Sequence, residues 1–178
     1  MTEKHPDKEE CMRCLKEHST PAHVIRHCRA VTEAAMKIAG ELNRCGHDLN
    51  LELIQAAGLL HDVLRVENNH DLLGAELVEN MGYEAEADII RDHMKYSEFN
   101  SVESLTEKDI VCMADRIVRE DEYVGVDRRM EYILKKIERR NDAAAAKTAV
   151  AAKMEEMKRL ISQIETIIGM SMDELMNK

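Results

Sequence analysis

The stretch GLLHDVLRVENNHDLLGAEL, residues 58–77, places a polar pair inside a run of aliphatic residues. His61 and Asp62 follow the apolar segment AAGLL and are followed at once by Val63 and Leu64. Burying an unpaired carboxylate and an imidazole at the end of an apolar helix costs on the order of several kcal/mol. The rest of the chain must therefore supply something that offsets this cost.

The composition predicts a helical, globular chain. Hydrophobic residues make up 44% of the 178 residues and charged residues 34%, which excludes a disordered chain. The length suits one domain with a real core. Alanine, leucine, glutamate, lysine and methionine dominate, whereas aromatic residues are few, and this bias favours helix over strand. We therefore expect an all-α fold.

Charge and cysteine content restrict the partners and the compartment. The net charge is −10 and no basic tract is present, so long nucleic acid is not an expected partner. A small anionic substrate remains compatible with this charge if a metal supplies local positive charge. The charged start MTEKHPDKEE, the absence of a membrane-length apolar run and the odd number of cysteines predict a cytoplasmic protein without a membrane anchor.

Apolar periodicity and capping residues predict a succession of helices. The expected ranges are 7–17, 21–44, 51–64, 70–81, 84–96, a helix opened by Thr106, and continuous helix after Val126. Asn50 and Asn69 are the expected N-caps of the third and fourth helices. The last helix carries an apolar stripe from Met154 to Ile168, which either the body of the chain or a second copy in a homodimer must cover.

Ionisable residues interrupt several of these apolar faces. A single histidine on such a face is more often a core residue than a ligand, and a single inward aspartate is more often a cap or an ion-pair partner. Here the successive helices carry five such positions, and each adds its own burial cost. If the faces converge, a divalent cation offsets all of these costs at once, because neutral imidazoles and carboxylates bind transition metals. The positions are His27, His61 with Asp62, His70, His93 and Asp115.

The order of these residues resembles the HD superfamily of metal-dependent phosphohydrolases. The matching pieces are HVIRHCRAVTEAA, AAGLLHDVLR, HDLLGAEL, IIRDHM and VCMADRIV. The resemblance implies a single-domain helical bundle over 20–135, preceded by a short helix in 1–19 and followed by a helical extension over 136–178. The sequence departs from the common HDIGK form of the family, with Leu64 in place of glycine and Arg65 in place of lysine.

The resemblance also implies roles for the individual residues. His27, His61, Asp62 and Asp115 would bind one metal ion, and His70 and His93 would bind a second. Two ions are favoured over one because two histidines from different helices are costly for phosphate contact alone. The metal would be iron, manganese, nickel, zinc or cobalt, and Arg65, Arg26 and Arg116 would contact the substrate.

The implied reaction is hydrolysis of a small phosphate ester or a nucleotide. A metal-activated water would attack phosphorus, and Asp62 would act as the catalytic residue that orients this water or accepts its proton. Two alternatives remain open: a di-iron oxygenase of HD type, and a sensor that binds a nucleotide without cleaving it. Cys11 and Cys14 form a single CxxC, and because a structural zinc needs four ligands we expect this pair to pack in the core.

Overall fold

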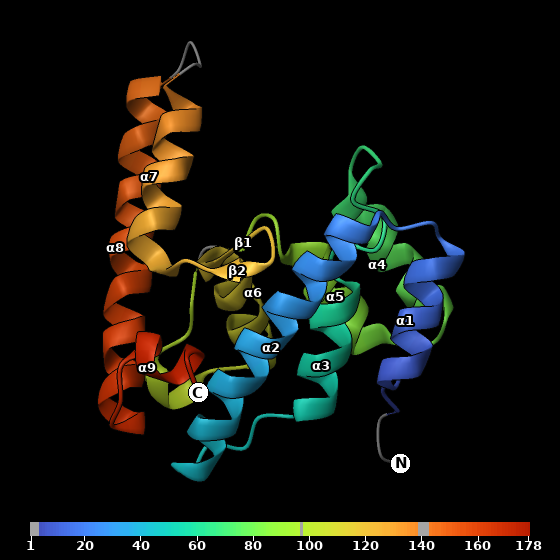
Figure 1. The fold of residues 1–178 in the computed structure, drawn as a ribbon, viewed down its shortest axis with the longest axis horizontal. Coiled ribbons are helices and arrows are strands. Elements are labelled where there is room, and N and C mark those ends of the chain that lie inside the picture. Colours follow the sequence, from blue (N-terminus) through green and yellow to red (C-terminus); the bar gives the residue numbers. More distant parts are fainter. Residues whose placement is uncertain (1–3, 97, 139–142) are drawn as a thin grey trace.

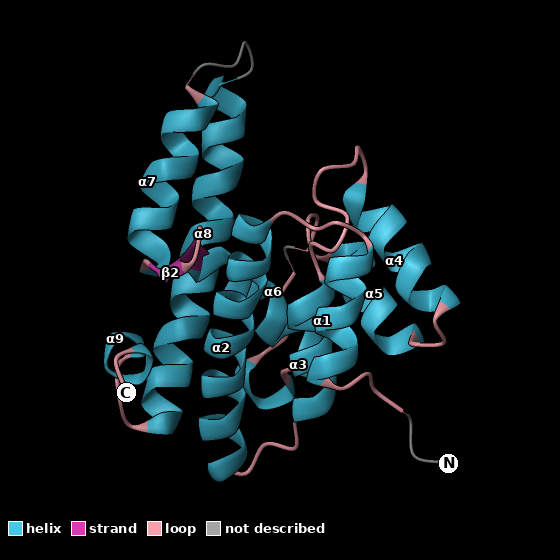
Figure 2. Ribbon diagram, turned by 45° about the vertical axis from the view of Figure 1, so that its right-hand side comes forward, coloured by secondary structure: helices cyan, strands magenta, loops and turns pink. Residues whose placement is uncertain are grey.

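The chain folds as a series of α-helices joined by short turns, with one small β-hairpin (Figure 2). This computed structural model describes residues 4–96, 98–138 and 143–178. In chain order the elements are α1 (Lys8–Glu17), α2 (Ala22–Arg44), α3 (Leu51–Leu60), α4 (His70–Asn80), α5 (Glu84–Asp92), the 3₁₀ turn η1 (Val102–Ser104), α6 (Glu107–Ile117), β1 (Val118–Arg119), β2 (Glu122–Tyr123), α7 (Gly125–Ile137), α8 (Ala143–Ile168) and α9 (Met172–Met176). The helical-bundle prediction is confirmed, and the antiparallel β1–β2 hairpin is an addition that the sequence did not indicate.

Capping side chains explain where several helices begin. The Asn50 side chain accepts hydrogen bonds from the backbone N–H groups of Glu52 and Leu53 at the start of α3, as predicted. Asn69 also stands at its predicted position before α4, but its side chain makes no capping hydrogen bond. Its backbone lies in the left-handed region with φ 59°, a conformation that asparagine tolerates better than most residues. Asn69 therefore acts through its backbone and not as the predicted side-chain cap.

Two of the predicted helical ranges are too long, and a third is divided into several helices. The helix expected over 51–64 ends at Leu60, where turns with i→i−3 hydrogen bonds take over. The helix expected over 84–96 ends at Asp92. The continuous helix expected after Val126 is divided into α7, α8 and α9, and Gly169, at φ 71°, ends α8. The part of that prediction that falls on residues 139–142 lies outside the described residues.

The long helix α2 lies at the centre of the fold and packs against α3 and α6 (Figure 1). On one side α4 and α5 pack together, and on the other α7 and α8 form an antiparallel pair that extends beyond the rest of the bundle. The predicted boundary between 135 and 136 falls inside α7, so the division of the chain into parts stays a proposal. No helix in the described residues is long and apolar enough to cross a membrane.

The apolar stripe of α8 is covered within the chain. Met157 and Ile164 are 1% and 0% exposed, and both belong to the core cluster that includes residues of α2 and α6. The body of the chain therefore provides the surface that the stripe requires. The homodimer remains an untested prediction. Because the apolar stripe is covered within the chain, it gives no reason to expect a dimer.

Close packing between α2 and α3 gives a first prediction, on stability. A Cβ atom at Gly58 would lie 2.7 Å from Thr32 Oγ1 and 3.2 Å from the Thr32 Cα. Gly58→Ala should therefore reduce the free energy of unfolding by about 1–3 kcal/mol, because backbone atoms must move apart. Gly40→Ala is the matched control: it lies in α2 with nothing within 4 Å of its Cβ position, and alanine should leave stability unchanged or raise it. Urea unfolding measures both, and a Gly58→Ala variant as stable as the wild type would contradict this view of the contact.

Candidate metal centre

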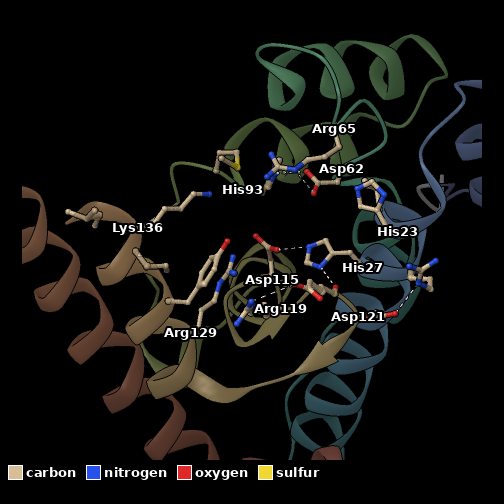
Figure 3. A pocket seen from close by; sticks show the side chains of 17 residues that line it. His23, His27, Asp62, Arg65, His93, Asp115, Arg119, Asp121, Arg129 and Lys136 are labelled. Atoms are coloured by element: carbon tan, nitrogen blue, oxygen red, sulfur yellow. Dashed lines mark hydrogen bonds and ion pairs between the residues drawn. The ribbon is translucent and has the colours of Figure 1, made fainter. Parts of the chain in front are cut away.

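The six histidine and aspartate side chains singled out in the sequence come together in two adjacent groups. One group is His27, His61 and Asp115, and the other is Asp62, His70 and His93. Within each group, one potential ligand atom from each residue lies within 4.8 Å of the others. Residues of both groups line a cavity of about 920 Å³, into which His27, Asp62, His93 and Asp115 point (Figure 3).

Helix ends bring these residues together. His61 is the C-cap of α3, Asp62 lies in the turn that follows, and His93 is the C-cap of α5. His70 begins α4, while His27 projects from the long helix α2 and Asp115 from α6. Adjacent residues on a continuous helix point about 100° apart, so the break after Leu60 allows His61 and Asp62 to serve one site together.

Backbone carbonyl groups orient three of the four histidine rings. The Nδ1 atoms of His27, His61 and His93 lie 2.7, 2.8 and 2.6 Å from the carbonyl oxygens of Glu120, Gly58 and Ile90 respectively. Because a carbonyl oxygen can only accept, Nδ1 carries the hydrogen and the Nε2 atom of a neutral ring keeps its lone pair. This second contact on the far side of the ring is typical of histidines that bind metals.

Asp62 lies between the two groups. Its Oδ1 atom is 3.2 Å from His70 Nε2 and 3.5 Å from His93 Nε2, while its Oδ2 atom is 3.8 Å from His61 Nε2. Asp115 faces the first group only, with its Oδ1 atom 3.1 Å from His27 Nε2. Asp62 is thus the carboxylate that can serve both groups.

Three buried atoms of the site make no hydrogen bond with any described residue: His61 Nε2, His93 Nε2 and Asp62 Oδ1. Each such atom costs about 1–3 kcal/mol when it is left without a partner. All three atoms carry lone pairs and lie in the two adjacent groups, so cations bound there would satisfy them. On this ground the residues fit a bound transition metal.

The electrostatics of the site favour the metal-binding protonation states of Asp62, Asp115 and His61, whereas Asp115 and Asp62 raise the pKa values of His27 and His93 respectively against the effect of burial. Burial alone would raise the pKa of Asp62, but its interactions with the rings of His61, His70 and His93 outweigh burial and hold this pKa well below its usual range. The pKa of Asp115 is also lowered: burial opposes the shift, while His27 and His61 dominate. Burial lowers the pKa of His61, which keeps its ring neutral. Ionised carboxylates and a neutral imidazole are the forms that bind metal.

Comparison with known proteins places the chain in a family. The HD domain family matches residues 24–120, which is more than half of the chain. The chain belongs to the HD domain family. The match covers α2 to β1 and contains all six side chains of the two groups.

Relatives of the chain are distant. An uncharacterised protein of Methanocaldococcus jannaschii is 26% identical over 134 residues, covering 66% of this chain and 77% of the relative. Two proteins named tRNA (cytidine(56)-2′-O)-methyltransferase, from Picrophilus torridus and Thermoplasma volcanium, are each 26% identical and cover 96% of this chain. The chain spans about half the length of these two methyltransferases, 50% in each case. No solved structure matches the chain significantly.

The three arginines predicted to contact substrate occupy different places in this HD domain. Arg65 lines the cavity, with its Nε atom 3.3 Å from Asp62 Oδ2. Arg26 lines the cavity at an exposed position and pairs with Asp121 at 3.0 Å. Arg116 instead donates hydrogen bonds to the backbone carbonyl groups of Cys112 and Tyr96, and it lines a neighbouring pocket. Arg116 thus holds the chain that follows α5 and lies outside the cavity of the metal groups.

The cavity residues that were not predicted as site residues include Arg119, Arg129, Tyr132 and Lys136. Arg119 lies in β1 and the other three lie in α7. The spacing of 129, 132 and 136 puts three side chains on one helical face, and this i, i+3, i+7 pattern was the available signal. This pattern alone does not indicate a site, because charged residues on one face of a helix usually face solvent.

The CxxC pair takes no part in the metal groups. Cys11 and Cys14 are buried at 0% and 3% exposure, and their thiols contact the Pro6 carbonyl oxygen and the Met81 sulfur. Burial raises the pKa of Cys11 to about 12, which keeps its thiol protonated. The pair packs α1 onto the core, as the sequence predicted.

Asp109 anchors α6, the helix that carries Asp115. Its carboxylate is fully buried and accepts hydrogen bonds from the Tyr96 hydroxyl, from the backbone and side-chain N–H groups of Asn100, and from the Thr106 backbone and hydroxyl. Asp109→Ala leaves these buried donors without an acceptor, so we expect the free energy of unfolding to fall by at least about 3 kcal/mol. Equilibrium unfolding in urea measures the loss.

The pH dependence of this effect follows from the pKa of Asp109. Burial would raise that pKa, but the hydrogen bonds from Asn100, Tyr96 and Thr106 outweigh it and lower it. Stability from a lowered pKa is present above the unfolded value of about 3.9 and is lost as pH falls through the folded value. The difference in the free energy of unfolding between wild type and Asp109→Ala should therefore have its full size near neutral pH and should become smaller below about pH 4. A difference of constant size down to the acid transition would contradict this assignment.

Proposed function

We propose that this HD domain protein is a metal-dependent phosphohydrolase that acts on a small phosphate ester or a nucleotide. The observation that carries the proposal is the pair of adjacent histidine–aspartate groups at one cavity, with buried donor atoms left unpaired among the described residues. The cations that line the same cavity, Arg65 and Arg26 among them, suit an anionic substrate.

In this proposal the two groups hold two metal ions. His27, His61 and Asp115 would hold one ion, His70 and His93 would hold the other, and Asp62 could serve either group. When bound, the ions would supply Lewis acidity: they lower the pKa of a water towards neutrality and offset charge on phosphoryl oxygens. The donor set suits iron, manganese, nickel, zinc or cobalt.

The protein side chains orient the reactants. Asp62 is the proposed catalytic residue, because its ionised carboxylate can orient the attacking water or accept its proton. Arg65, next to Asp62, can donate two parallel N–H bonds to two non-reacting phosphate oxygens. Arg26 stands farther out at an exposed position, where it can guide a charged group towards the site.

The names of the methyltransferase relatives do not extend the proposal to RNA. The chain spans 50% of each of those proteins, so their activity need not lie in the part that it matches. The net charge of −10 also opposes binding to a long phosphate backbone. We therefore propose a small phosphorylated substrate.

A metal and substrate screen tests the function. Protein loaded with each of the five metals in turn is incubated anaerobically with phosphate monoesters, nucleoside polyphosphates, dinucleoside polyphosphates and cyclic nucleotides, and released phosphate is measured. We expect turnover with at least one metal and loss of turnover after chelation. A reaction that requires oxygen would favour the oxygenase, and recovery of every compound unaltered would favour the sensor.

A further inference from the structure

β1 and α7 build a second part of the cavity wall, which carries none of the residues of the metal groups. Arg119, Arg129 and Lys136 on this wall surround the ring of Tyr132. The Cζ atoms of the two arginines lie 4.4 and 5.7 Å from the ring centroid, and the Lys136 Nζ atom lies 5.9 Å from it. Figure 3 shows Lys136 extending from α7 across the cavity towards His93 and Arg65.

The positive charge of this wall is poorly offset. Other cations of the cavity have close partners, since Arg26 lies 3.0 Å from Asp121 and Arg65 lies 3.3 Å from Asp62. Arg119 has only the Glu120 carboxylate, at 3.6 Å, and that side chain is 78% exposed. The described residues offer no anionic partner to Arg129 or Lys136, and the Arg129 Nε atom is buried without a hydrogen bond. Three cations gathered at one ring repel each other, and a bound anion would remove this repulsion.

We propose that Arg119, Arg129 and Lys136 form a subsite for a second phosphate group of the substrate. The substrate is then a compound with a chain of at least two phosphoryl groups: the group to be cleaved lies at the metal groups, and another lies on the α7 wall. This inference rests on the proposed phosphohydrolase function and narrows its substrate class. A substrate with one phosphate would need only the metal groups and Arg65, whereas the second wall adds donors that suit further phosphate oxygens.

The chain offers a matched control for this wall. Arg129→Gln/Lys136→Gln removes two of the three cations. The control variant Arg128→Gln/Lys135→Gln removes the positive charges that immediately precede these two residues in the same helix. Both side chains are exposed, and neither lines the cavity. If the double variant does not fold, the single variant Lys136→Gln is used instead. Lys136 is exposed, so this substitution should not disturb folding.

Calorimetry on the metal-loaded protein compares two probes. Imidotriphosphate has three linked phosphoryl groups and resists hydrolysis, and inorganic phosphate has one. We expect Arg129→Gln/Lys136→Gln to bind imidotriphosphate at least about tenfold more weakly than the wild type and the control double variant, and Lys136→Gln to bind it several-fold more weakly. All of these proteins should bind inorganic phosphate equally.

The outcomes separate this inference from the proposed function. Equal affinity of the wild type and the Arg129→Gln/Lys136→Gln variant for imidotriphosphate would overturn the subsite, as would an equal loss for both probes. If hydrolysis is found, the variant should raise KM for polyphosphate substrates and leave KM for monoesters unchanged. If no phosphate compound is hydrolysed, the proposed function fails, and the calorimetric comparison still decides whether the subsite exists.

Discussion

Replacing Asp62 with alanine is expected to abolish phosphate release and to weaken metal binding at least about a hundredfold. Loss of a residue that only hydrogen-bonds to a metal ligand already lowers metal affinity by about 10–100-fold, and loss of a ligand should lower it further. Asp62 is the carboxylate that faces both groups, so its removal takes a ligand from each. It also removes the group proposed to orient the attacking water. Metal analysis of the purified variant and a phosphate-release assay measure the two effects.

Two further variants make the Asp62 result specific. Asp62→Asn keeps the size of the side chain but loses its charge, and we expect it to be inactive as well. Glu67→Ala removes an exposed carboxylate from the loop that follows, and it should keep the wild-type metal content and rate. An Asp62→Ala protein with wild-type metal content and turnover would show that the assignment of this site is wrong.

Replacing His70 or His93 with alanine should reduce the metal content of saturated protein from two equivalents to one. Each substitution removes one of the three side chains of the second group and leaves His27, His61 and Asp115 in place. His23→Ala is the matched control, because His23 lines the same cavity at an exposed position but belongs to neither group. Elemental analysis after dialysis against each metal measures the stoichiometry.

A different stoichiometry would change the account in a defined way. If the wild type saturates at one equivalent and neither histidine variant loses metal, the two-ion proposal fails. His70 and His93 would then act as phosphate contacts near a single ion.

The metal groups could be predicted from the sequence because their signal is local. Each of the six residues interrupts an apolar helical face or stands at a helix end, and the folded chain brings these faces together. The helix ends themselves were less predictable. Val63 and Leu64 resume the apolar run directly after His61 and Asp62, so the sequence does not show that the helix stops at Leu60.

The α7 wall and the hairpin could not be predicted in the same way. Arg129 and Lys136 have the spacing of an ordinary charged helix face, and only the packing of α7 beside α6 and β1 turns that face towards the cavity. The hairpin strands have two residues each, too few for an alternating pattern. Glu120 in the hairpin turn has a positive φ of 56°, and its carbonyl oxygen accepts the His27 Nδ1 hydrogen, a contact that backbone geometry alone decides.

The most direct test of the central claim is hydrolysis in ¹⁸O-labelled water without oxygen gas. Metal-loaded protein is incubated anaerobically with a nucleoside polyphosphate, and the released phosphate is analysed by mass spectrometry. We predict that the metal-loaded protein releases phosphate carrying one ¹⁸O atom, and that neither the chelated protein nor Asp62→Ala releases any. Absence of phosphate release with all five metals, or release that begins only when oxygen is admitted, would contradict the account.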